Sequence, residues 1–240
     1  NCCAASRPGR CRRNASGRYA REVRALRIWH REPEHVVLAA DDDLAVAAFT
    51  PVGGAPGGAP RPAHENGLVA AAVARVHEAG RSAPVAGIFP ALQDHLAKEV
   101  LPRVRHRLET TALGPRTGSA FRGGAGIREH PARRTLLHAD LYRENVLFTE
   151  DGRPVLLDPL PMTGDAAYDW AFWTIYYEVG SGTEDRLHRA RLASGIPVGQ
   201  LLPWCLLLGL DGLLYYETTG DARLTVMTGV LDSLLGKGTG

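Results

Sequence analysis

The sequence predicts an α+β fold in which a small amount of β structure precedes a mostly helical remainder. Three observations predict it. Short runs of strand-forming residues flank the acidic triplet Asp41-Asp42-Asp43, a second pair of such runs flanks Asp151-Gly152, and most other apolar residues recur at helical spacing. With 240 residues and 45% hydrophobic composition, the chain is long enough to form one large domain or two lobes.

The first elements predicted are a helix and a hairpin. In residues 19–29, Val23 and Leu26 recur at helical spacing with charged residues on the other side. Strands are predicted at residues 36–38 and 44–49 on either side of the acidic turn, which makes residues 19–50 a partial N-terminal lobe. Residues 1–18 show no strand pattern and are predicted to be an unstructured or atypical N-terminus.

A linker and a helical region follow. Residues 51–62, with the sequence PVGGAPGGAPRP, cannot hold a helix or a central strand and predict a linker. Residues 63–240 are predicted to form a mostly helical C-terminal lobe, with a glycine stop at Gly80 and a loop over residues 110–131. The predicted helices are residues 66–80, 91–108, 170–179, 183–193, 198–216 and 224–235.

The second hairpin is the most informative feature of the sequence. Val146-Leu147-Phe148 and Val155-Leu156-Leu157 flank Asp151-Gly152, a dipeptide that suits a two-residue turn. If this turn is the centre, cross-strand partners have numbers that add up to 303, and Asn145 faces Asp158 on one side of the hairpin. Two oxygen ligands there suit Mg²⁺, which usually takes one or two protein oxygens and completes its shell with phosphate and water.

The loop before this hairpin adds a candidate base. Asp140 lies five residues before Asn145, and His138 lies two residues before Asp140. Asp140 would orient an acceptor hydroxyl and take its proton while the metal offsets the charge of the transferring phosphate, and His138 would brace the loop. The alternative is a chance HxD in an ordinary surface hairpin, but HxDxxxxN leading into a hairpin that ends in Asp-Pro is much more specific.

These residues resemble the aminoglycoside phosphotransferase superfamily, small-molecule kinases with a two-lobed, protein-kinase-like fold. The segments HADLYRENVLF, LLDP and GDAAYDWAFW carry the resemblance and are most similar to the aminoglycoside 6-phosphotransferase and hydroxyurea phosphotransferase branch. The resemblance implies that Asp140 is the catalytic base, that Asn145 and Asp158 hold Mg²⁺, and that ATP is the donor. Family members usually have Gly at the position of Ala139, and this branch often has a basic residue at the position of Leu160.

The same resemblance implies roles for three residues near the N-terminus. The backbone around Ala48 and Phe49 would meet the adenine edge of ATP. Glu22 lies where kinases carry a helix glutamate that pairs with a phosphate-binding lysine, and the alternative is a solvated glutamate among arginines.

Two parts of a kinase are not visible in the sequence. A phosphate-binding loop and a strand lysine are expected before the helix that contains Glu22, yet Lys98 and Lys237 are the only lysines. Arg12 or Arg13 could supply the cation, but no strand is predicted to position either one. The N-terminal lobe is therefore expected to be incomplete, with a truncated or displaced start.

Acidic residues outside the hairpin have two interpretations. Asp169 is predicted to begin a buried helix by accepting backbone N–H bonds, and a direct chemical role is the alternative. A polycationic acceptor would favour an acidic cleft, and solvated surface positions are the alternative. The possible contributors are Asp165, Glu178, Glu184, Asp185, Asp211 and Glu217.

Charge and composition narrow the function further. The net charge of +2 is small and the arginines are dispersed outside residues 7–24, a pattern that does not indicate nucleic-acid binding. No apolar run reaches the roughly 18 residues of a membrane span. The four cysteines form neither a disulfide framework nor a CxxC pair, and no secretory signal is visible, so a cytoplasmic location is expected.

The sequence therefore predicts an ATP- and Mg²⁺-dependent phosphotransferase that acts on a hydroxyl of a small molecule, expected to be a cationic antibiotic of the aminoglycoside type. Three alternatives remain open. They are an inactive or truncated kinase relative that acts as a binding protein, a metal-dependent hydrolase that uses Asp140 and Asp158, and a nucleic-acid-binding module that uses the arginine-rich N-terminus.

Overall fold

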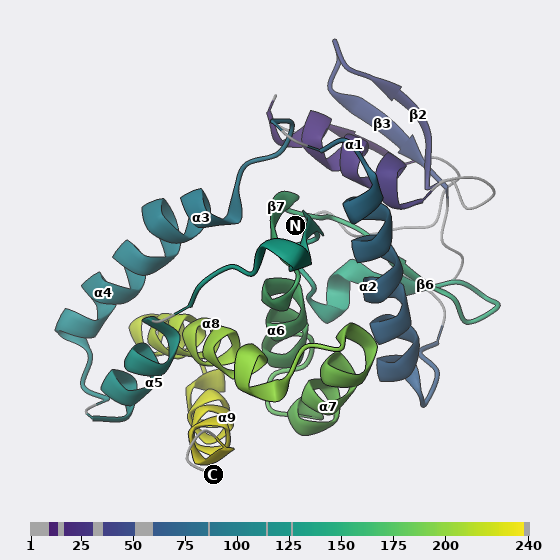
Figure 1. The fold of residues 1–240 in the computed structure, drawn as a ribbon. Coiled ribbons are helices and arrows are strands. Elements are labelled where there is room, and N and C mark those ends of the chain that lie inside the picture. Colours follow the sequence, from purple (N-terminus) through teal and green to yellow (C-terminus); the bar gives the residue numbers. More distant parts are fainter. Residues whose placement is uncertain are drawn as a thin grey trace. The chain divides into compact units, whose positions relative to one another are not determined.

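The computed structural model describes two compact units (Figure 1). Its described residues are 10–13, 17–30, 36–50, 60–85, 87–113, 115–125 and 127–237. Unit 1 consists of residues 1–89 and 135–163, and unit 2 consists of residues 90–134 and 164–240. The catalytic segment therefore groups with the N-terminal residues, whereas the sequence analysis assigned it to the helical lobe.

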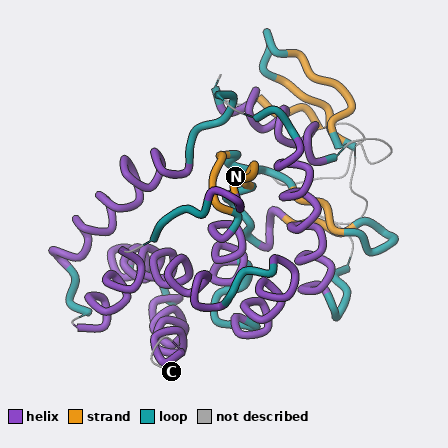
Figure 2. The backbone as a smooth tube through the Cα atoms, in the orientation of Figure 1, coloured by secondary structure: helices purple, strands orange, loops and turns teal. Residues whose placement is uncertain are grey.

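Unit 1 contains a three-stranded antiparallel sheet in the order β1-β3-β2 (Figure 2). Strands β2 (Val37–Asp41) and β3 (Val46–Phe49) confirm the predicted hairpin. Strand β1 (Arg10–Arg13) was not predicted, and the expectation of an unstructured N-terminus was wrong for these residues. The local sequence shows no strand pattern there because the backbone partners come from β3, more than 30 residues away.

Two helices complete the N-terminal part of unit 1. Helix α1 (Arg18–Trp29) buries Val23 and Leu26, and helix α2 (Glu65–Ser82) continues through the predicted stop at Gly80. A Cβ atom at Gly80 would lie 2.7 Å from Thr135 Oγ1 and 2.8 Å from the Leu136 nitrogen. Gly80 therefore allows α2 to approach strand β4 (Arg134–Leu137) closely, rather than ending the helix.

The predicted hairpin forms, but its register differs by one residue from the prediction. Strand β5 (Val146–Phe148) pairs with β6 (Pro154–Leu156), with Val146 opposite Leu156. The turn is a three-residue loop, because the Thr149 N–H donates to the Arg153 carbonyl at 2.9 Å and Gly152 has a positive φ of 77°. Asn145 consequently lies opposite Leu157, whose N–H donates to the Asn145 carbonyl at 2.8 Å, and the predicted Asn145–Asp158 pair was wrong.

Unit 2 is helical and is organised around one apolar helix, α8 (Val198–Thr219). Helices α5 (Pro115–Ala125), α6 (Ala167–Tyr176) and α9 (Arg223–Lys237) all pack against α8 (Figure 1). The other elements that belong wholly or partly to this unit are α3 (Leu92–His95), the π-helical turn Leu96–Val100, α4 (Leu101–Thr110), the 3-10 turn Pro131–Arg133, strand β7 (Met162–Asp165) beside β4, and α7 (Thr183–Ser194).

Helix α5 lies where a loop was predicted, and its glycines explain both the prediction and the outcome. Glycine disfavours an isolated helix, so the local sequence argues against one. In the structure a Cβ atom at Gly123 would lie 2.7 Å from Leu206 Cδ1, and one at Gly124 would lie 2.9 Å from Leu207 Cβ. The missing side chains let α5 approach α8, and this tertiary packing overrides local propensity.

Among the described residues, α8 is the one helix with the length and apolar composition to cross a membrane. Within its most apolar window, 67% is buried inside the structure. This burial is the pattern of the core helix that the sequence predicted.

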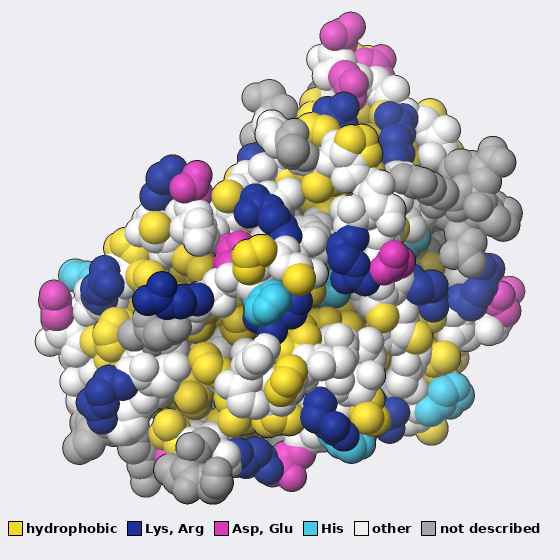
Figure 3. All heavy atoms as spheres, in the orientation of Figure 1, with side chains coloured by type: hydrophobic (Ala, Val, Ile, Leu, Met, Phe, Trp, Pro, Cys, Tyr) yellow, Lys and Arg dark blue, Asp and Glu magenta, His cyan; other side chains and the backbone are white. Residues whose placement is uncertain are grey.

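On the surface, basic and acidic side chains are interspersed over the face drawn in Figure 3.

Candidate active site

The catalytic loop joins β4 to the 3-10 turn Arg143–Asn145, and His138 ties it to the chain after β6. His138 is fully buried, its Nδ1 accepts the Asp140 N–H at 3.3 Å, and its Nε2 lies 3.1 Å from the Leu157 carbonyl. A ring whose Nδ1 accepts a backbone N–H must carry its proton on Nε2, which can then donate to that carbonyl. Trp29 stacks on the ring at a centroid distance of 5.8 Å.

Two residues of the site have left-handed backbone conformations. Ala139 has φ of 58° and is 3% exposed, and Asp158 has φ of 57°. The left-handed conformation costs an L-residue roughly 1–2 kcal/mol relative to glycine, so the site stores backbone strain at both positions. The conformation also explains why glycine suits the position of Ala139.

Asp140 and Asn145 form the centre of the site. The Asn145 side-chain amide donates to the Asp140 carbonyl at 2.8 Å and to Asp140 Oδ2 at 2.9 Å. Burial raises the pKa of Asp140 to about 6, opposed by the Asn145 hydrogen bond. The charges of Asp158 and Glu144 raise this pKa further, and the charge of Arg18 lowers it. A carboxylate with such a pKa has the property that a general base needs near neutral pH.

Asp158 lies just after β6, where it faces the start of α1. Its Oδ1 atom is 3.7 Å from Arg18 Nη2, and the two side chains are 28% and 47% exposed. The sequence analysis did not single out Arg18. Arg18 could have been noticed in the sequence because it lies in the first turn of a helix, where a basic residue is unfavourable, and because that turn has no acidic residue.

The oxygen atoms of Asn145 and Asp158 fit a magnesium ion. Because the Asn145 nitrogen donates to Asp140, its amide oxygen remains available as a ligand, and the charge of Asp158 lies near enough to Asp140 to raise its pKa. Among the described residues no group of three or more His, Cys, Asp or Glu side chains could hold a metal. A site with few protein oxygens, completed by water and phosphate, is what Mg²⁺ prefers.

A basic side chain that the sequence analysis missed holds the end of the catalytic loop. Arg61 Nη2 donates to the carbonyls of Arg143 at 2.6 Å and Val146 at 2.8 Å, and its Nη1 donates to Glu65 at 3.0 Å. Glu65 also accepts a hydrogen bond from Arg143 at 2.9 Å. These contacts fix the backbone on both sides of Asn145.

The residues expected to contact the nucleotide lie in helix α1 and in strand β3. Glu22 is 3% exposed, so the alternative of a solvated glutamate was wrong. Ala48 lies in the central strand of the sheet, and Phe49 is the last residue of that strand. The backbone of Arg12 is held in β1 opposite Ala47, so the expectation that no strand holds Arg12 or Arg13 was also wrong.

In unit 2, the aspartate that begins α6 is Asp165 rather than Asp169. Asp165 accepts the Ala167 N–H and the His130 N–H, each at 2.9 Å, and binds the Arg133 guanidinium through two hydrogen bonds of 2.9 and 2.6 Å. Asp169 lies inside the first turn of α6 and is fully buried. Asp169 therefore does not precede the helix as predicted, because α6 begins three residues earlier than its aromatic pattern suggests.

Several acidic residues considered for a cleft that binds a cationic acceptor already have basic or hydrogen-bonding partners within unit 2. Asp211 binds Arg103 at 2.5 Å and Arg107 at 3.2 Å. Glu217 accepts hydrogen bonds from Thr111 at 2.5 Å and from the Ala112 N–H at 3.0 Å. Their charges therefore stabilise helix packing in unit 2, and fewer remain to attract a cation.

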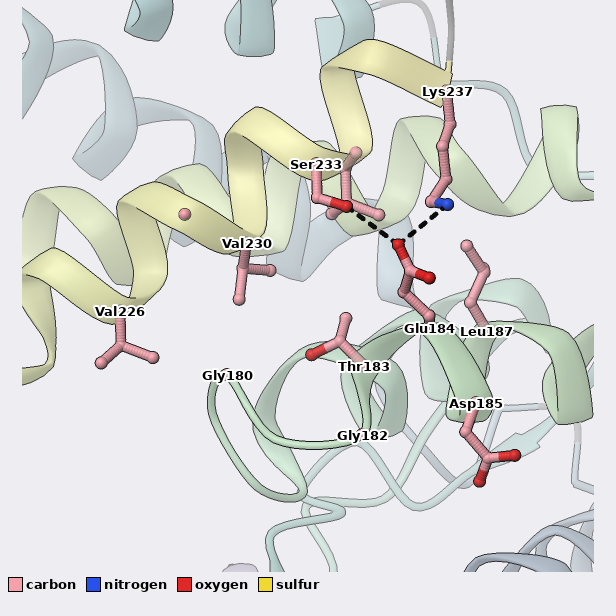
Figure 4. A pocket seen from close by; sticks show the side chains of 12 residues that line it. Gly180, Gly182, Thr183, Glu184, Asp185, Leu187, Val226, Val230, Ser233 and Lys237 are labelled. Atoms are coloured by element: carbon pink, nitrogen blue, oxygen red, sulfur yellow. Dashed lines mark hydrogen bonds and ion pairs between the residues drawn. The ribbon is translucent and has the colours of Figure 1, made fainter.

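A cavity of about 370 Å³ lies elsewhere in unit 2, between the loop that precedes α7 and helix α9 (Figure 4). Glu184 points across it and contacts Ser233 at 3.2 Å and Lys237 at 3.0 Å. Asp185, which also lines the cavity, pairs with Arg189. The cavity thus contains two of the acidic residues considered for a cationic acceptor, both of them paired, and none of the predicted catalytic, nucleotide-binding or metal-binding residues.

Comparisons with known proteins find sequence similarity to fructosamine and ketoamine kinases. The model of the fructosamine kinase family matches residues 93–183, which is less than half the chain but includes the catalytic loop and hairpin. A "probable ketoamine kinase" of Staphylococcus aureus is 40% identical over 52 residues, which is 22% of this chain. That match spans only 18% of the relative's own length.

Two solved structures share the fold. A protein assigned as a fructosamine-3-kinase, from Thermobifida fusca, aligns with a TM-score of 0.58 and 20% identity over 92% of this chain and 81% of its own. An aminoglycoside phosphotransferase in complex with AMP-PNP and hygromycin B aligns with a TM-score of 0.63 and 20% identity over 94% of this chain and 85% of its own.

The relatives support the predicted superfamily but do not confirm the 6-phosphotransferase branch. The α+β, two-lobed fold class predicted from the sequence is confirmed. The chain thus has the kinase-like fold of these two solved structures, and its residues 93–183 are similar in sequence to the fructosamine kinase family.

Proposed function

We propose that this chain is an ATP-dependent kinase that phosphorylates a hydroxyl group of a ketoamine of the fructosamine type. The observation that carries the proposal is the partly buried Asp140, held by Asn145 in a loop that His138 braces, within a segment that matches the fructosamine kinase model. The pKa of about 6 suits a base that must be ionised at neutral pH yet able to take a proton.

The proposed reaction is the transfer of the γ-phosphoryl group of ATP to the acceptor hydroxyl. The oxygen of the acceptor hydroxyl forms a bond to the γ-phosphorus of ATP while the bond from that phosphorus to the bridging oxygen breaks and ADP leaves. The hydroxyl proton passes to Asp140, which then returns it to water. The hydrogen bond from Asn145 turns the Asp140 carboxylate toward one orientation, and the buried His138 keeps the loop backbone in place.

Asn145 and Asp158 are the proposed holders of Mg²⁺. The metal would offset negative charge on the triphosphate. Arg61 and Glu65 act indirectly, since they fix the backbone that carries Asn145. We place Glu22, Ala48 and Phe49 on the nucleotide side of the site, and a cytoplasmic location, where ATP is abundant, fits this activity.

The choice of acceptor rests on two arguments. The matched family model and the ketoamine kinase relative both favour a ketoamine. The cationic antibiotic expected from the sequence would need free acidic side chains, yet Asp165, Asp211 and Glu217 already bind partners inside unit 2. An aminoglycoside remains the comparison substrate in the test.

The test is ATP-dependent phosphorylation of a synthetic fructosamine by the purified chain, followed by phosphate-sensitive mass spectrometry. Product with the fructosamine, and much less with streptomycin or hygromycin B, is the expected result. Product with the antibiotics and none with the fructosamine would show that the proposed acceptor is wrong and that the kinase assignment is right. ATP binding without any product would favour the alternative of an inactive binding protein, and phosphate release from a phosphoester without ATP would favour the hydrolase.

A further inference from the structure

Arg18 has a position that no role described above explains. It is the first residue of α1, and its guanidinium lies 3.7 Å from the proposed metal ligand Asp158. This separation is longer than a hydrogen bond, and the Arg18 side chain is 47% exposed. Its five N–H donors are therefore not consumed by Asp158, and most can contact a ligand that enters the site.

The electrostatics of α1 sharpen this observation. The N-terminal end of a helix carries a partial positive charge, and a cation there is typically unfavourable. Helix α1 nevertheless begins with Arg18, has no acidic residue in its first turn, and is preceded by Gly17, which has no side chain to cap it. Positive potential is thus concentrated beside Asp158, and helix stability does not account for it.

We propose that Arg18 is a nucleotide-binding residue that contacts the phosphates of ATP and that pairs with Asp158 when no nucleotide is bound. The proposal rests on the proposed kinase function. Arginine suits this task because its charge is permanent and its planar group binds phosphate through two parallel hydrogen bonds. Arg18 would then perform part of the work of the strand lysine that the sequence analysis found missing.

This arrangement predicts opposite effects on two ligands. Magnesium alone must compete with the Arg18 charge for Asp158, so removal of Arg18 should strengthen Mg²⁺ binding, by about fivefold for one like charge screened by water. A triphosphate gains charge-assisted hydrogen bonds from Arg18, so the same removal should weaken its binding by about 10- to 100-fold. A residue that only supports the fold would weaken both.

The experiment is calorimetry on the whole chain with three probes: magnesium chloride, inorganic tripolyphosphate and Mg·ATP. The variants are Arg18→Gln and Arg18→Lys, with Arg24→Gln as the matched control because Arg24 is exposed on the same helix. Stronger binding of Mg²⁺ and weaker binding of both phosphates by Arg18→Gln, partial recovery by Arg18→Lys, and no change in the control are expected.

Three outcomes would overturn the proposal. Unchanged phosphate binding by Arg18→Gln would remove Arg18 from the site while the kinase assignment stands. Parallel weakening of all three probes, with a lower melting temperature, would make Arg18 structural. Failure of the unmodified chain to bind Mg·ATP would instead overturn the proposed function together with this inference.

Discussion

Two aspartates, one in each unit, show how differently the fold treats a buried carboxylate. Asp165 in unit 2 is fully buried and receives four hydrogen bonds, two from Arg133 and two from backbone N–H groups. Asp140 in unit 1 is partly buried, and among the described residues Asn145 alone donates to its carboxylate. Satisfied donors make a carboxylate structural, whereas burial without a full set of donors leaves it basic and reactive.

The largest expected effect comes from removal of the reactive carboxylate. Asp140→Asn keeps the shape of the side chain but cannot accept the hydroxyl proton, so kcat should fall by about 10²- to 10⁴-fold. The urea midpoint at neutral pH should rise, because burial raises the pKa of Asp140 and the ionised carboxylate therefore destabilises the folded chain. Turnover within tenfold of the unmodified chain would show that Asp140 is not the base.

The corresponding substitution in unit 2, at Asp165, should lower stability and leave turnover nearly unchanged. Asp165→Asn removes the charge that Arg133 pairs with in a buried position, and breaking such a pair costs about 3–5 kcal/mol of folding free energy. Urea unfolding measures this loss, and turnover per folded molecule should remain within a few-fold. Asp221→Asn, which breaks the more exposed pair with Arg223, is the control and should cost much less.

The pH dependence of turnover by the unmodified chain tests whether Asp140 is the basic carboxylate. Burial first, and then the charges of Asp158 and Glu144, raise the pKa of Asp140 from 3.8 to about 6, against the effects of Asn145 and Arg18. Because the ionised base is needed, kcat/KM should rise about tenfold per pH unit below that pKa and level off above it. A flat profile between pH 5 and 7 would contradict this assignment.

The same shift affects stability, with a sign opposite to that of a salt-bridged aspartate. Between the ordinary pKa and the raised one, the folded chain binds more protons at Asp140 than the unfolded chain does. The contribution of Asp140 to the free energy of unfolding should therefore decrease as pH rises through that window. Asp140→Asn should remove this part of the pH dependence.

The smallest expected effect concerns the strain beside Asp140. Ala139→Gly relieves a left-handed conformation that costs roughly 1–2 kcal/mol, and loses about 0.5–1 kcal/mol to the greater backbone entropy of the unfolded chain. A net stabilisation of about 0.5–1 kcal/mol in urea unfolding is expected. Ala72→Gly, inside α2 of the same unit, should have the opposite sign.

Local patterns were sufficient for much of this protein. Most helices and the two hairpins have apolar periodicities that can be read along the chain, and the candidate site lies in one short segment with a specific spacing of His138, Asp140 and Asn145. The resemblance to a family of small-molecule kinases and the proposed reaction type both come from that segment, because its residues are neighbours in the sequence and also in space.

Tertiary structure decided what depends on residues far apart. Strand β1 exists through its pairing with β3, α5 forms by close packing on α8, and Arg18 reaches Asp158 across 140 residues of chain. The one-residue change of register in the catalytic hairpin came from a local choice between turn types that the dipeptide Asp151-Gly152 does not determine. Periodicity reports which face of an element is buried, but distant contacts determine which backbones approach and which charges remain unpaired.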